Sequence, residues 1–186
     1  MVSIVELWLP ILLSGVAVFI LSSIIHMVLK YHNNDFSALP SEEQVMADIG
    51  KHNLPPGEYH FPRAKDMKEM SSPEFVAKLK RGPVGFITVM ENAPMNMGKS
   101  LTQWFIYSII VGIFVAYVTG QAVGPGADYL KVFQFAGTTA FIAYSIAHWQ
   151  NTIWYKRSWK VTLKNNIDGL IYALFTAGVF GWLWPV

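Results

Sequence analysis

The sequence contains no cysteine, which excludes disulfides, thiolate metal sites and thiol nucleophiles. Charge is also scarce, because only 14% of the 186 residues are charged and the net charge of +2 is too small to indicate a nucleic-acid ligand. The HExxH signature and the phosphate-binding glycine loop are both absent. No enzyme class is therefore indicated, and the length leaves no room for a second large soluble domain.

Apolar residues are abundant instead, at 53% of the chain. Four apolar runs are long enough to cross a hydrocarbon layer of about 30 Å as helices. We interpret the first run as a retained span, because MVSIVELWLP lacks the positive start of a signal peptide. The sequence thus predicts an all-α integral membrane protein with a four-transmembrane-helix bundle. The four runs are about Val5–Leu29, Leu101–Gly120, Leu130–Trp149 and Ile167–Trp184.

Small side chains recur at every fourth position in the second and fourth runs. This spacing places them on one face of a helix, where the backbone of another helix can approach closely. We expect both rows to be helix-packing faces, either within one bundle or between copies. The rows are Ser108, Gly112, Ala116 and Gly120, and Gly169, Ala173, Ala177 and Gly181.

The long connection between the first two runs has secondary-structure signals of its own. Ser41 and Gln44 have the spacing of a capping box, which predicts a short helix to about His52. Ser72-Pro73 predicts the start of a second helix, which Gly82-Pro83 ends. Two short strands are expected to pair with each other, at Glu58–Phe61 and Val84–Met90.

These elements predict a small cytoplasmic α+β cap between helices 1 and 2. The chain then divides into transmembrane helix 1 at 1–29, the cap region at 30–100, and transmembrane helices 2–4 at 101–186. Most of the 14 Lys and Arg residues lie in the cap region or in the connection 150–166, whereas the opposite side has only Lys131. Because positive charge favours the cytoplasmic side, we expect both termini outside.

Polar residues gather at the expected cytoplasmic end of the bundle. At about 1.5 Å per residue, His26 lies about 27 Å from Trp8, and His148 and Asp168 fall at a similar depth. One interpretation makes all three interfacial residues, with Asp168 favoured by the dipole at the start of its helix. The other makes them one cluster, either a proton relay or a set of metal ligands. His26 and His148 are also the pair that could bind a haem iron axially.

The C-terminal half, from LTQWFIYS through GADYLKVF to DGLIYALFTAGVFGWLWP, resembles small four-span bacterial inner-membrane proteins of unassigned function. The resemblance implies a multi-pass protein of a bacterial inner membrane. It implies no activity and assigns no functional residues.

The sequence favours a non-enzymatic membrane component that assembles with or regulates a larger membrane protein complex. Its close-packing rows and its methionine-rich cap region are typical of a protein with partners, which would be other membrane subunits or a second copy within the bilayer. Two alternatives stay open: a small oligomeric transporter or channel, and a redox subunit that binds haem or a metal. The sequence itself requires no cofactor.

Overall fold

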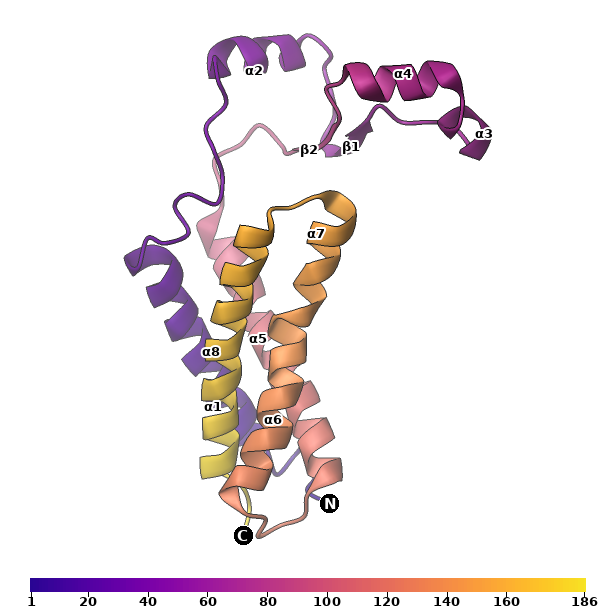
Figure 1. Ribbon diagram of the computed structural model, residues 1–186. Helices are drawn as coiled ribbons and strands as arrows, with labels where there is room; N and C mark the ends of the chain where they lie inside the picture. The colour runs from indigo at the N-terminus through magenta and orange to yellow at the C-terminus, as the bar shows by residue number, and fades with distance from the viewer. The chain divides into compact units, whose positions relative to one another are not determined.

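The computed structural model describes residues 1–186 and is mostly helical. It divides into two compact units, which are shown in Figure 1. The first, here called the bundle unit, joins Met1–Phe36 to Asn96–Val186. The second, here called the cap unit, is Ser37–Met95. Each unit is described by itself.

The bundle unit is built from four long helices and three short helical segments. The long helices are α1 (Trp8–Ser23), α5 (Met97–Ala122), α6 (Tyr129–Tyr144) and α8 (Trp159–Trp182). The short segments are the π-helix η1 (Ile24–Val28), the 3-10 helix η2 (Ile146–His148) and α7 (Trp149–Tyr155).

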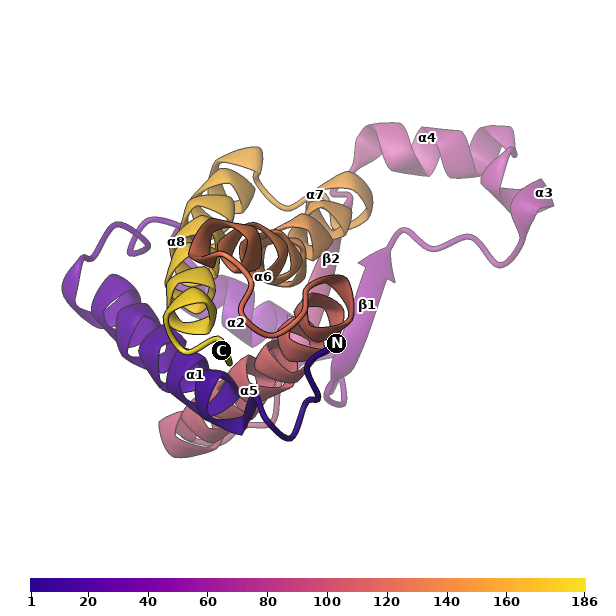
Figure 2. The ribbon, with the colours of Figure 1, turned by 90° about the horizontal axis from the view of Figure 1, so that it is seen from below.

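The four long helices form a closed ring in the order α1, α5, α6, α8. Each helix packs against its two neighbours in the ring, as Figure 2 shows in a view from below. They run alternately up and down, so both chain termini lie at one end of the bundle. Backbone hydrogen bonds hold the termini to the ends of the α5–α6 connection, from Val2 N–H to the Gly120 carbonyl (2.9 Å) and from Gly126 N–H to the Pro185 carbonyl (2.8 Å).

Two stretches of helix are long and apolar enough to cross a membrane, Trp8–Val28 and Met97–Ala122. The other two expected spans differ from the sequence prediction in their bounds. Helix α6 ends at Tyr144, because Ser145 leaves the helical region with φ −122° and ψ −57°. Helix α8 begins at Trp159 rather than near Ile167, so its first two turns include two lysines and two asparagines, Lys160, Lys164, Asn165 and Asn166.

The small-residue rows lie inside the bundle. All four members of the α5 row are buried, and a methyl group at Gly112 would lie 3.3 Å from the Ile11 carbonyl of α1. In the α8 row Gly169, Ala173 and Ala177 are buried, and they face α6. These rows therefore bring neighbouring helices of one chain together.

The cap unit pairs two strands and carries three short helices. Its elements are α2 (Glu42–Gly50), β1 (Gly57–Phe61), α3 (Met67–Met70), α4 (Pro73–Arg81) and β2 (Gly85–Val89). The strands are antiparallel, with Tyr59 opposite Ile87, which confirms the predicted pairing. The predicted start of α4 is also confirmed, because the Ser72 hydroxyl accepts a hydrogen bond from Phe75 N–H (3.2 Å).

One predicted helix N-cap in this unit is not formed. Ser41 does precede α2, but its backbone is left-handed (φ 52°) and its side chain caps no backbone N–H group. An N-cap residue needs an extended backbone for its side chain to reach back to the first turn. The capping box of Ser41 and Gln44 is therefore not formed. A cap that the sequence analysis missed is Asp66, whose carboxylate accepts from Glu69 N–H (2.7 Å) at the start of α3.

Candidate site at the charged end of the bundle

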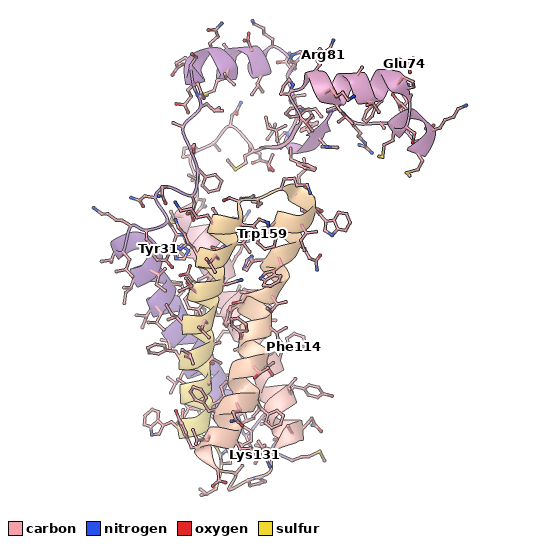
Figure 3. All side chains as sticks on the ribbon, viewed as in Figure 1. Tyr31, Glu74, Arg81, Phe114, Lys131 and Trp159 are labelled. Carbon is pink, nitrogen blue, oxygen red and sulfur yellow. The ribbon has the colours of Figure 1, made fainter.

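The candidate site lies at the end of the bundle opposite the termini. Figure 3 labels Tyr31 and Trp159 at this end and Lys131 at the other. Here α1 widens into the π-helix η1, in which Leu29 N–H donates to the carbonyl of Ile24, five residues back (3.1 Å). Single π turns within α-helices are frequent at functional sites. This one carries His26, whose Nδ1 lies 3.1 Å from the Ser22 carbonyl oxygen.

The chain reverses directly after η1. Lys30 adopts a left-handed backbone with φ 50°, which ends the helix and turns the next residues back toward it. His32 consequently stacks on His26, with ring centroids 4.5 Å apart and planes 16° from parallel. Two histidines that are six positions apart, and would not share a face of an ideal helix, thus come into direct contact.

His32 lies between two carboxylates. Its Nδ1 is 2.5 Å from Oδ2 of Asp35 and its Nε2 is 2.8 Å from Oδ2 of Asp168. The three side chains are all largely buried, with exposed fractions of 12% or less. Carboxylate oxygens can only accept, so each ring nitrogen forms a hydrogen bond here only when it carries a proton. The arrangement therefore places both ring nitrogens of His32 against hydrogen-bond acceptors.

Lys164 of α8 holds the reversing segment in place. Its ammonium group donates to Oδ1 of Asp35 (2.5 Å), to Oδ1 of Asn34 (2.8 Å) and to the Tyr31 carbonyl (2.5 Å). Burial acts to raise the pKa of Asp35, but the hydrogen bonds from Lys164 and His32 outweigh it and hold the pKa below its ordinary value. Asp35 is thus ionised at neutral pH.

Asp168 contributes a second oxygen that has no partner in the protein. The residue is 3% exposed, and its Oδ1 is buried without a hydrogen bond. The same is true of the Tyr172 hydroxyl and the Thr176 hydroxyl, which follow at intervals of four on the same face of α8. An unpaired buried carboxylate oxygen is energetically costly, so this position calls for a ligand, a water or an ion.

The structure brings together two of the three residues that the sequence nominated. His26 and Asp168 both belong to the cluster, but His148 does not: it lies exposed in η2, because α6 ends one turn before it. His32 takes the place expected for His148. The pairing of Asp168 with a histidine is therefore present, with a different histidine, and the haem pair of His26 and His148 is not assembled.

A sequence signal for His32 existed in the spacing of its partners. Lys164 and Asp168 are four positions apart on α8 and share one face, while His32 and Asp35 are three apart in a short polar turn. Each pair has one basic and one acidic side chain, so the base of one pair can bond to the acid of the other. The sequence signal was therefore a His-x-x-Asp turn directly after an apolar run, together with a Lys-x-x-x-Asp spacing on α8 that offers the complementary charges.

Chemically, the cluster offers a set of metal-ligating atoms. One ligand atom from each of His26, His32 and Asp168 lies within 4.8 Å of the other two. Imidazole and carboxylate are also the groups that move protons near neutral pH. Comparisons with protein-family models, with curated proteins and with solved structures found no match for this chain.

Proposed function

We propose that the chain is a multi-pass membrane protein whose helices α1, α5, α6 and α8 all cross the bilayer, with both termini outside a bacterial inner membrane. The outer surface of the bundle supports this, because large apolar side chains are exposed on all four helices. Phe114 of α5, for example, is 62% exposed, whereas Ser108 and Thr119 of the same helix are buried. An apolar outside with small and polar residues inside is typical of helices packed within lipid.

The packing of α6 and α8 beside the two apolar stretches supports four crossings rather than two. Helix α8 has 24 residues and extends about 36 Å in all. Its apolar part from Ile167 covers about 24 Å of a hydrocarbon layer of about 30 Å. Its ends carry the exposed Trp159 and Trp182, as expected for aromatic rings at two membrane interfaces. Helix α6 has 16 residues and is continued by η2 and α7. Since both helices pack beside the two apolar stretches, they share the same depth.

The topology has a direct test. A reporter enzyme that is active only outside the membrane, fused after Val186, should be active, whereas the same reporter fused after His52 should be inactive. An active fusion at His52 together with an inactive one at Val186 would invert the proposed orientation.

We further propose that the protein is a non-enzymatic component of a larger membrane complex, and that its cap unit contacts the partner subunit. The observation that carries this proposal is the lack of a core: of the residues Ser37–Met95, only Pro62 and Phe75 are buried. Units of about 60 residues that fold alone bury about 60% of the surface of the unfolded chain. The cap unit therefore needs a further surface to cover it.

The side chains on the cap unit fit a protein partner. Half of its exposed large apolar residues are methionines, which adapt to irregular apolar surfaces and are common at binding surfaces. Met46 of α2 is 58% exposed and Met90, just after β2, is 69% exposed. We therefore expect an apolar contact with another membrane-protein subunit.

The test is the mass of the full chain after extraction from its native membrane in a mild detergent. We expect a particle that contains at least one further protein, and a monodisperse 20.9 kDa monomer would contradict the proposal. Met46→Gln replaces an exposed apolar side chain by a polar one of similar size and should weaken the association. Glu43→Gln, on the same helix at an exposed polar position, is the matched control and should leave the association unchanged.

A further inference from the structure

We infer that His26, His32 and Asp168 form a binding site for one divalent first-row transition-metal ion. The inference rests on the bundle unit alone and does not depend on the partner proposed for the cap unit. Two imidazoles and one carboxylate suit ions such as Zn²⁺ or Fe²⁺, and three protein ligands leave further coordination positions for water.

The hydrogen bonds of the two histidines point to this use. Nδ1 of His32 faces the Asp35 carboxylate at 2.5 Å, and Nδ1 of His26 faces the Ser22 carbonyl at 3.1 Å. A carbonyl oxygen can only accept, so Nδ1 of His26 carries the proton and Nε2 carries the free lone pair. Metal-binding histidines almost always donate one ring N–H to a carboxylate or a backbone carbonyl, which fixes the tautomer and orients the other nitrogen. Both types of orienting partner are present here.

The supporting partners are themselves fixed. Asp35 accepts from the Lys164 ammonium group (2.5 Å), so its carboxylate cannot rotate away from His32. The π turn at Ile24–Val28 sets the direction of His26. The ligands thus come from η1, from the reversing turn and from α8, and each is held by contacts with its surroundings.

Asp168 supplies an independent observation that points to a ligand. Its side chain is 4% exposed, its Oδ2 bonds to Nε2 of His32, and its Oδ1 has no partner in the protein. A metal ion between His32 and Asp168 would replace the proton that now lies between them. Bound through Oδ1, or through both oxygens, the ion would also give Oδ1 a partner.

The distances are within reach of a coordination sphere. Two ligand atoms that are each about 2.1 Å from a tetrahedral ion lie about 3.4 Å apart. The pair of Nε2 and Oδ2 is now at 2.8 Å, and all three ligand atoms lie within 4.8 Å of one another. The required changes in distance are therefore about 0.6 Å outward for one pair and at most about 1.4 Å inward for the others.

The experiment uses the full chain in detergent micelles, purified without a polyhistidine tag, stripped with a chelator and titrated with Co²⁺. We expect one equivalent of Co²⁺ to bind with visible absorption bands of nitrogen and oxygen ligation, and Zn²⁺ to displace it, since Zn²⁺ binds such sites more tightly. A wild-type protein that shows no saturable binding at one equivalent would overturn the inference.

Variants identify the ligands. His26→Ala and Asp168→Asn should each weaken binding about 100-fold or more, because loss of a supporting partner alone typically weakens it 10–100-fold. Asp35→Asn, which removes such a partner, should fall within that smaller range. His148→Ala is the control, since His148 is an exposed histidine outside the cluster. The side chain of His26 is also partly exposed, so its variant is expected to fold. If His26→Ala binds Co²⁺ as the wild type does, the cluster is an ion-pair network only.

Discussion

The packing of α6 on α8 predicts a large difference between two glycine substitutions in the same helix. A methyl group added at Gly169 would lie 3.0 Å from the carbonyl carbon and oxygen of Tyr144 and would overlap the Ser145 hydroxyl. At Gly178 the nearest atom would be the Tyr129 hydroxyl at 3.7 Å, an ordinary contact. Gly169→Ala and Gly178→Ala therefore each add one methyl group to α8. The added group meets a steric conflict at Gly169 and none at Gly178.

The magnitude follows from this comparison. Carbon atoms pack at about 3.5–4.0 Å, and the backbone of Tyr144 cannot rotate aside, so α6 and α8 have to separate by several tenths of an ångström. Overpacking of this kind costs about 1–3 kcal/mol. Replacing glycine by alanine inside a helix gains about 1 kcal/mol of helix propensity, and this gain is common to both variants. The difference in the free energy of unfolding between them is therefore about 1–3 kcal/mol, with Gly169→Ala the less stable.

Thermal unfolding of the purified full chain in one detergent measures the difference, with tryptophan fluorescence and helical circular dichroism as two probes. Domains of 150–250 residues change their Tm by about 2–4 °C per kcal/mol, so we expect Gly169→Ala to unfold several degrees below Gly178→Ala. Equal Tm values for the two variants would show that α8 does not approach α6 closely at Gly169. The conclusion that the small-residue row of α8 packs against α6 would then be wrong.

Three further changes test the charged end and the cap unit. Lys164→Met leaves Asp35 buried without its cation and should lower the free energy of unfolding by about 2–4 kcal/mol in a denaturant titration; an unchanged titration midpoint would contradict the importance of this ion pair. Asp168→Asn and His32→Gln, measured singly and together without metal, should show a coupling energy of about 1–3 kcal/mol, whereas additive effects would show that the two side chains do not interact. Ser72→Ala removes the cap of its helix and should destabilise it by about 1 kcal/mol, seen as faster amide exchange in α4; exchange at the wild-type rate would argue against the cap.

Local signals predicted the local structure well. Ser72-Pro73 defined the start of α4, because a side-chain cap and a proline at the first position both act within one turn. The small-residue rows predicted which faces of α5 and α8 are buried, since spacing alone places side chains on a face. The capping box at Ser41 failed because the left-handed backbone of that residue depends on more than its sequence neighbours.

The candidate site could be predicted only in part, because it depends on where two helices end. Counting residues at a constant rise placed His148 level with Asp168, but the break at Ser145 ends α6 before His148. Helical spacing does not place His32 on the face of His26, whereas the left-handed turn at Lys30 returns it to His26. The spacing of Lys164 and Asp168 on α8 could be read from the sequence, whereas the backbone angles at Lys30 and Ser145, which decide where two helices end, could not.

The two ends of the bundle are closed by different kinds of interaction, and this difference bears on the metal site that we infer at one of them. At the end with the termini, neutral groups form the ties, such as the Trp184 indole N–H that donates to the Gly124 carbonyl (2.9 Å). At the other end the ties are charged and largely buried, from Lys164 through Asp35 and His32 to Asp168. Burying charges for stability alone gains little or nothing, because the cost of removing them from water offsets their attraction. A charged closure that also leaves one carboxylate oxygen unpaired is therefore better explained by ligand binding than by stability.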